Sequence, residues 1–178
     1  GPARAVWPPE GSPGRALFSF LFSLFSPCPF SLFSFIFSLL MGRGELVRRY
    51  EEGPRVLRAA VERVGEARLD LVPADGSWTA RQVVHHVADS EMTSALRLRR
   101  LLAEEDVVIV GYPEDVWAKR LYYHGRPIAN SLAAIEAARA TTLEILERMS
   151  EDEWQRAGTH NELGRYTPEV WLEVYARH

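Results

Sequence analysis

The chain has 178 residues, which is enough for one domain with an ordinary hydrophobic core but too few for two domains of usual size. Its formal net charge is −3, and its arginines alternate with acidic residues instead of gathering in one basic cluster. Proteins that bind nucleic acid normally carry such a cluster. We therefore expect no nucleic-acid partner.

The N-terminal segment differs in composition from the rest of the chain. From Leu17 to Leu40 every residue is Phe, Ser, Leu or Pro, apart from Cys28 and Ile36. A DNA strand made only of pyrimidines encodes only those four residue types. The composition therefore favours upstream DNA read as protein, with Met41 as the true start.

The alternative for this segment is a membrane anchor or a signal sequence. Residues 16–40 carry no charge and are numerous enough to span a bilayer. Pro27 and Pro29 interrupt the stretch, however, and its serines lower its hydrophobicity. We interpret residues 1–40 as a low-complexity segment outside the fold and residues 41–178 as the domain. A cytoplasmic protein is then expected, with membrane association through residues 16–40 as the alternative.

Amphipathic helical patterns begin directly after this segment. The first runs from Glu45 to Val64, and Gly53-Pro54 can kink or split it. The second begins at an N-cap, Ser77 or Thr79, and runs to about Glu105. In both patterns the apolar residues recur every three or four positions, which is typical of a helix with one buried face.

Two more helical patterns follow after a long connection. The third begins at Asn130 or Ser131 and runs to about Met149. Thr167-Pro168 predicts the start of the fourth, because it places a capping residue before a proline at the first helical position. No stop signal precedes His178. Four long helical patterns predict an all-α fold, a four-helix bundle with a long connection between helices 2 and 3.

The connections carry weaker signals. Val107 to Gly111 is the only strand-like piece, and we expect it to be an apolar loop because one strand has nothing to pair with. Tyr112 to Arg126 is predicted as a long connection with a short helix around Trp117. Ser150 to Glu153 reads as a capping box that opens a short turn.

Histidines lie on the predicted helices in a pattern that favours a metal site. At 100° per residue, His86 lies on the flank of the apolar stripe of the second helix, whereas His85 points almost the opposite way and is expected at the surface. On the fourth helix His178 shares a side with Trp171 and Val174. A lone histidine near a helix core is more often a hydrogen-bonded structural residue. Two histidines also hold zinc poorly without a third ligand.

Several motifs resemble those of the DinB/YfiT-like superfamily, whose members are four-helix metalloproteins. The second-helix motif is Trp78-Thr79 followed by His86, Asp89 and Glu91. The connections that resemble this family contain Gly111-Tyr112, Trp117-Ala118 and Arg120-Leu121, then Gly158-Thr159-His160 and Tyr166-Thr167. The resemblance covers about residues 45–178.

The resemblance implies which residues bind the metal. Family members carry one ligand histidine on the second helix, which corresponds to His86, and two on the last helix, four residues apart. The first of that pair corresponds to His178, and the third ligand is expected beyond the end of this sequence, so that the chain is a truncated form. His160 or His124 could replace it, although both are expected in loops. Asp89 and Glu91 would support the metal ligands from behind or face the substrate, although acidic residues next to a helix surface are usually just solvated.

Three histidines leave coordination positions open on a divalent ion, which is typical of a catalytic site. Related enzymes include bacillithiol transferases and a mycothiol-dependent maleylpyruvate isomerase. The resemblance therefore implies transfer of a low-molecular-weight thiol to an electrophilic small molecule, with zinc or nickel as the ion. Two alternatives remain open, namely a metal-dependent hydrolase and a non-catalytic ligand-binding or stress-related bundle. A homodimer is also compatible with the resemblance.

Overall fold

The computed structural model describes residues 42–178. The predictions for residues 1–40, both the low-complexity segment and the membrane anchor, lie outside the described residues. None of the helices within residues 42–178 is both long and apolar enough to cross a membrane.

The first helix, α3, spans Arg43–Val64 and is not split at Gly53-Pro54. A proline inside a helix removes one backbone N–H, so the carbonyl four residues earlier loses its usual partner. Here that carbonyl belongs to Tyr50, and it accepts a hydrogen bond from Arg139 Nη1 at 2.8 Å. A side chain thus replaces the missing backbone donor, and the helix continues. A short 3₁₀ turn, η1 (Glu66–Arg68), follows.

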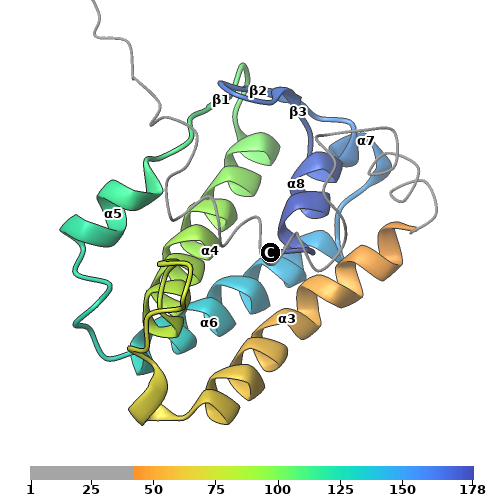
Figure 1. Ribbon diagram of the computed structural model, residues 1–178. Helices are drawn as coiled ribbons and strands as arrows, with labels where there is room; N and C mark the ends of the chain where they lie inside the picture. The colour runs from red at the N-terminus through yellow and green to blue at the C-terminus, as the bar shows by residue number, and fades with distance from the viewer. Residues whose placement is uncertain (1–41) are drawn as a thin grey trace, which may run out of the picture.

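The second helix, α4, spans Ala80–Ala103 and runs through the centre of the molecule (Figure 1). Thr79 is its N-cap, in a capping box with Gln82, as expected for one of the two predicted caps. In Figure 1, α5 lies on one side of α4 and α8 on the other, with α6 below. As a result every residue from Val84 to Glu91 is buried. This helix therefore has no fully exposed face along its N-terminal half.

The remaining helices agree with the predicted order. They are α5 (Glu114–Arg120), α6 (Ala129–Leu146), α7 (Glu151–Trp154) and α8 (Pro168–Tyr175). α6 ends before the predicted Met149. The N–H groups of Ala176 and Arg177 still bond to carbonyls of the last turn of α8, so that the helical path continues almost to His178. The all-α, four-helix-bundle prediction is confirmed, with α3, α4, α6 and α8 as the long or core-forming helices.

The expectation that the strand-like piece has nothing to pair with is wrong. Three short strands, β1 (Val108–Ile109), β2 (Gly158–His160) and β3 (Gly164–Tyr166), form a sheet in the order β1-β2-β3. β1 runs parallel to β2, and β2 forms an antiparallel hairpin with β3. The partner strands are too short and too rich in glycine to show an alternating pattern, which is why the sequence did not reveal them.

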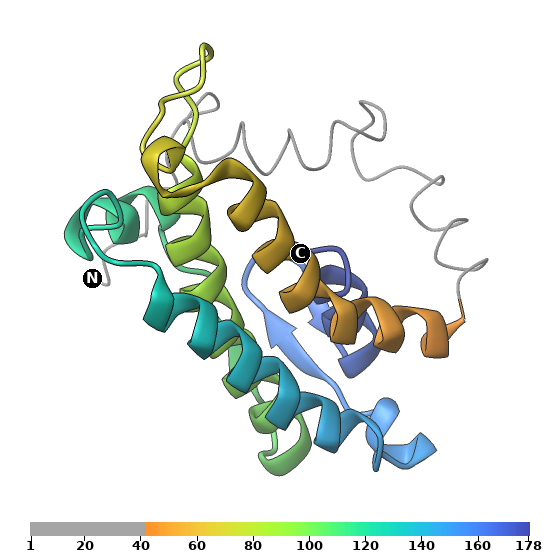
Figure 2. The same cartoon turned by 90° about the horizontal axis from the view of Figure 1, so that it is seen from below.

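The core has three clusters, of which the smallest packs Trp78, Ala118 and Tyr123 beside α5, and the other two extend along the bundle. One surrounds Tyr50, Leu98 and Trp171 and joins α3, α4 and α8 to the sheet. The other surrounds Val84 and Ile135 and joins α4 to α6. Figure 2, the view from below, shows α3 and α6 crossing this side of the bundle, and in both views the end of the chain lies among α3, α4 and α6. The chain thus ends beside these helices, with His178 partly buried and Arg177 exposed.

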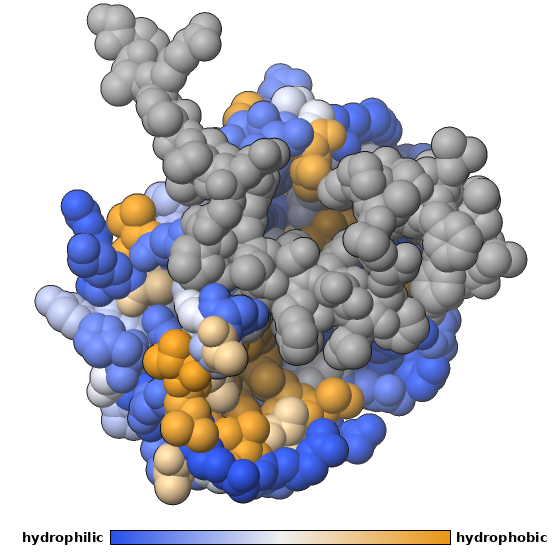
Figure 3. Space-filling view, in the orientation of Figure 1, coloured by the Kyte–Doolittle hydropathy of each residue, from blue (hydrophilic) through white to orange (hydrophobic). Residues whose placement is uncertain are grey.

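Hydrophobic side chains also reach the surface. The space-filling view shows them gathered in the lower part of the face seen in Figure 3. Among the exposed apolar residues near the end of α3 and the following loop are Val56, Leu71 and Val72.

Candidate metal centre

His86 lies on α4 with its side chain inside the bundle. The residue is only 7% exposed, and the edge of the Trp78 ring packs against it with the ring centroids 5.1 Å apart. Its Nδ1 atom is buried and has no hydrogen-bond partner among residues 42–178. A structural histidine would normally use both ring nitrogens, so this arrangement favours a ligand over a structural residue.

His178 approaches His86 from the end of α8. The two imidazole centroids are 5.6 Å apart, and the Tyr175 ring lies 5.9 Å from that of His178. On α4, Glu91 Oε1 is 3.5 Å from His178 Nδ1. The structure therefore brings together the two histidines that the sequence predicted as ligands, from two different helical segments.

Burial keeps the His86 imidazole neutral. Loss of solvent, with a smaller contribution from His178, lowers the pKa of His86 from 6.5 to about 3. A neutral imidazole keeps a lone pair, which is the form that binds a metal ion. Burial also acts to raise the pKa of Glu91, but its contacts with His178 and Arg139 outweigh this and keep that pKa below its ordinary value. The site thus contains neutral imidazole beside a charged carboxylate.

The predicted substitutes for a third ligand are not grouped with these histidines. Within residues 42–178 no three His, Cys, Asp or Glu side chains are arranged to hold a metal ion. His160 lies in β2, where its Nδ1 accepts hydrogen bonds from the N–H groups of Glu162 and Leu163, and His124 is exposed in a loop. Within the described residues His86 and His178 thus lie together, and no third ligand of this kind is arranged with them.

The prediction that His85 lies at the surface is wrong. His85 is fully buried, with Nδ1 2.7 Å from Ser131 Oγ and Nε2 3.0 Å from the carbonyl oxygen of Arg126. The helical projection assumed one buried stripe, whereas α6 and the segment before it cover the opposite side of α4. His85 thus joins α4 to α6 and has a structural role.

The acidic residues of the second-helix motif are also buried instead of solvated. Asp89 accepts a short hydrogen bond from the Tyr123 hydroxyl, whose pKa is raised by burial and then by this carboxylate. Glu91 is fully buried and forms an ion pair with Arg139 of α6, with 2.7 Å between Oε1 and Nη2. The two carboxylates therefore have separate partners, one on each side of α4.

The connection after β1 places aromatic and acidic groups near the histidines. Tyr112 stacks on Trp117 with their ring centroids 4.1 Å apart, and Arg97 lies 6.0 Å from the Tyr112 ring. Burial raises the pKa of Glu114 at the start of α5. Ala118 of α5 packs in one cluster with Trp78, which contacts His86, so α5 borders the site.

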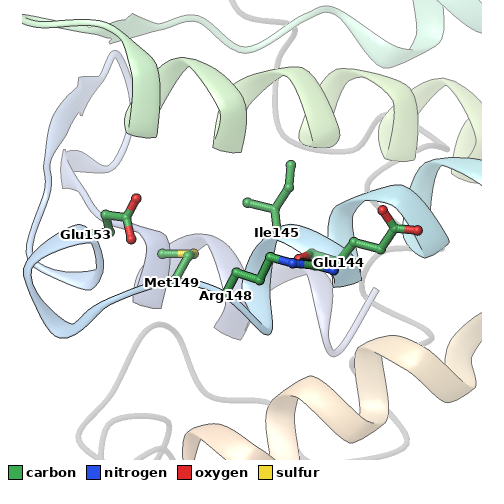
Figure 4. Close-up of a pocket in the computed structure, with 5 residues that line it drawn as sticks. All are labelled: Glu144, Ile145, Arg148, Met149 and Glu153. Carbon is green, nitrogen blue, oxygen red and sulfur yellow. Dashed lines mark hydrogen bonds between the residues drawn. The ribbon is translucent and has the colours of Figure 1, made fainter.

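A surface pocket lies elsewhere, at the end of α6 (Figure 4). Glu144, Ile145, Arg148, Met149 and Glu153 line it, and the figure shows Arg148 and Glu144 along its rim. It contains none of the histidines. We therefore place the functional site at His86 and His178.

Comparison with known proteins identifies the family. A family model described as the DinB superfamily matches residues 49–178. The chain belongs to the DinB superfamily. A relative in Oceanobacillus iheyensis, named "Putative metal-dependent hydrolase", is 36% identical over 134 residues, which are 75% of this chain and 77% of that protein.

YfiT of Bacillus subtilis is a further DinB relative. Under the name "Putative metal-dependent hydrolase YfiT" it is 34% identical over 110 residues, or 62% of each chain. A solved structure of YfiT, described as "a probable metal-dependent hydrolase with an unusual four-helix bundle topology", superposes with a TM-score of 0.71 at 28% identity. The match covers 86% of this chain and 85% of that one. The predicted family and fold are thereby confirmed.

The sequence offered signals for the residues that were missed. Glu91 lies at helical spacing from the buried Val84 and Leu98, and Arg139 lies in the same way between Ile135 and Leu146. A charged residue in the middle of each apolar stripe predicts a buried ion pair between α4 and α6.

Proposed function

We propose that this DinB-superfamily chain is a metal-dependent enzyme, most simply a hydrolase, in which His86 and His178 are two of the metal ligands. The observation that carries the proposal is the pair of facing imidazoles, 5.6 Å apart, with a buried ring nitrogen of His86 that has no protein partner within the described residues. The names of the DinB relatives support the metal dependence and the hydrolase.

Zinc or nickel is the ion we expect. A divalent ion with open coordination positions would supply Lewis acidity and would lower the pKa of a water molecule bound to it toward neutral pH. The chain itself supplies the orientation of the ligands. The Trp78 edge holds the His86 ring, and Glu91 contacts Nδ1 of His178. Burial by Trp78 and Tyr175 keeps bulk water away from the imidazoles and maintains the neutral form of His86.

The substrate we propose is a small electrophilic molecule, and we expect a cytoplasmic protein that does not bind nucleic acid. Transfer of a low-molecular-weight thiol stays a prediction, since the names of the relatives support hydrolysis and not thiol transfer. A homodimer also stays a prediction.

An activity assay with and without thiol separates the two reactions. The protein, loaded with Zn²⁺ or Ni²⁺, is incubated with a panel of chromogenic esters and amides and with electrophilic haloarenes, in the presence or absence of a small thiol. Hydrolysis is expected without thiol, and it should be lost with a chelator and in His86→Ala. The exposed His124 provides the matched control, because His124→Ala should retain activity. Turnover that requires the thiol would favour thiol transfer, and turnover unaffected by both chelator and His86→Ala would refute the proposed metal site.

A further inference from the structure

A side chain from α6 is docked in the middle of α3. Pro54 leaves the carbonyl of Tyr50 without its helical partner, and Arg139 Nη1 donates to that oxygen at 2.8 Å. The guanidinium also lies over the Tyr50 ring, 4.4 Å from its centroid. The Gly-Pro pair thus creates an acceptor inside a helix, where the backbone normally offers none.

Gly53 provides the space for this docking. A Cβ atom at Gly53 would clash with the guanidinium of Arg139, because Nη1 lies too close to the position where that carbon would be built. A Cβ at Gly44, in the first turn of the same helix, would meet nothing within 4 Å. Gly53 therefore has a specific role that the other glycine of α3 does not share.

The second amino group of Arg139 reaches the end of the bundle that carries His178. Nη2 donates to Glu91 Oε1 at 2.7 Å and to the carbonyl oxygen of Tyr175 at 3.0 Å. Arg139 and Glu91 are 4% and 0% exposed, respectively. One buried guanidinium thereby joins α3, α4 and the last turn of α8 to α6.

Two of these contacts converge on His178. Glu91 Oε1, the atom that Arg139 holds, is 3.5 Å from His178 Nδ1, which is an ion-pair contact longer than an ordinary hydrogen bond. Tyr175, whose carbonyl Arg139 also holds, precedes His178 by three residues on the same helical path. The arginine therefore fixes both the carboxylate that faces the imidazole and the backbone that carries it.

We propose that Arg139 and Glu91 are positioning residues for His178. Gly53 leaves the space for Arg139, and Pro54 leaves the Tyr50 carbonyl to which Arg139 donates. Arg139 fixes the Glu91 carboxylate, Glu91 accepts the proton of His178 Nδ1, and Nε2 then keeps the lone pair for a ligand bond. This deepens the proposed function, on which it rests for the identity of what His178 binds. Carboxylates that accept the second N–H of a ligand histidine fix its tautomer and orientation in this way.

A contribution to folding stability explains the buried Arg139–Glu91 pair less well than a role in positioning His178. Replacing a buried ion pair by apolar residues of similar size is often neutral or stabilising, so such a pair is poor evidence for a contribution to folding. Here the charged pair is combined with a proline and a glycine inside α3, and all of these features meet at one carboxylate beside His178.

The test is the tautomer of His178 in the metal-free protein, read from the ¹⁵N chemical shifts of its ring nitrogens. His178→Gln assigns the signals. In the unaltered protein we expect Nδ1 protonated and Nε2 unprotonated. Glu91→Gln should change this tautomer ratio, and so should Gly53→Ala, which touches neither histidine but displaces Arg139. An unprotonated Nδ1 in the unaltered protein would overturn the proposal without any variant.

Two matched substitutions serve as controls. Gly44→Ala makes the same change in α3 where there is space, and Glu136→Gln makes the same change in an exposed pair with Arg58. Both should leave the His178 shifts unchanged. If Gly53→Ala folds and also leaves them unchanged, Arg139 does not position His178.

Zn²⁺ affinity then separates this proposal from the proposed function. Glu91→Gln should bind Zn²⁺ roughly 10–100-fold more weakly than the unaltered protein, as for other carboxylates that support ligand histidines. If the unaltered protein binds no Zn²⁺ or Ni²⁺ but shows the expected tautomer, the proposed function fails while the positioning role stands. If it binds metal and Glu91→Gln binds equally well with an unchanged tautomer, the positioning role fails while the proposed function stands.

Discussion

Replacement of Arg139 by methionine should strongly destabilise the domain. The substitution preserves most of the side-chain volume but removes the cation from a site that is 4% exposed. Glu91, which is fully buried, then loses the guanidinium that pairs with it, and the Tyr50 carbonyl beside Pro54 loses its donor. The effect should therefore exceed that of an ordinary surface charge.

The expected loss follows from these two groups. Removing one partner of a buried ion pair costs about 3–5 kcal/mol, because the remaining charge is buried without compensation. An unsatisfied buried carbonyl costs about 1–3 kcal/mol. The two costs overlap, since Glu91 can take up a proton, and we expect a total loss of about 3–5 kcal/mol in the free energy of unfolding. Such a loss is a large part of the roughly 5–15 kcal/mol that stabilises a typical domain.

Urea unfolding followed by tryptophan fluorescence measures this loss, since Trp171 is buried in the same core. The double variant Arg139→Met with Glu91→Leu should be more stable than Arg139→Met alone, because no charge is left unpaired. The exposed pair Arg58 and Glu136 is the control, and its double-mutant cycle should give less than about 1 kcal/mol. The reasoning would be refuted if Arg139→Met lowered the free energy of unfolding by less than about 1 kcal/mol. It would also be refuted if the effects of Arg139→Met and Glu91→Leu were strictly additive.

Three further outcomes are expected. In metal-free protein the free energy of unfolding should fall as the pH falls from 6.5 to about 3, because His86 takes up a proton at a higher pH in the unfolded chain than in the folded one. His86 should contribute a slope of at most about 1.4 kcal/mol per pH unit. The variant His86→Gln should lack this contribution. His85→Ala should destabilise the fold by about 1–3 kcal/mol in urea unfolding, since it removes the Ser131 partner and one of the two contacts to the Arg126 carbonyl, to which Arg81 also donates; an unchanged midpoint would contradict its structural role. Thr79→Ala should cost about 0.5–2 kcal/mol by the same measurement, through loss of the N-cap of α4, and Thr79→Ser should retain most of it.

The helices were predictable from the sequence because their signals are local. The capping box of Thr79, the Ser150 box and the proline after Thr167 each place a helix start where the structure has it. The same holds for the inward face of His86, because a local pattern of 100° per residue determines it. The strand pairing of β1 with β2 was not predictable, since it joins short segments far apart in the chain.

The surroundings of α4 explain the errors at the site. A single projected stripe places His85 at the surface, whereas helices on several sides bury it. Gly53-Pro54 allowed either a kink or a split in α3, and the position of Arg139 across the bundle explains why the helix continues. Contacts between segments far apart in the chain determine both the burial of His85 and the continuity of α3. A helical projection contains no information about such contacts.

The most direct test of the central claim is a Co²⁺ titration of the chain, followed by the visible absorption of the bound ion. We expect the absorption to saturate with added Co²⁺ in the unaltered protein and in His124→Ala, and to be lost in His86→Ala and in His178→Ala. Unchanged binding in His86→Ala, or equal loss in all three variants, would contradict a metal centre built on His86 and His178.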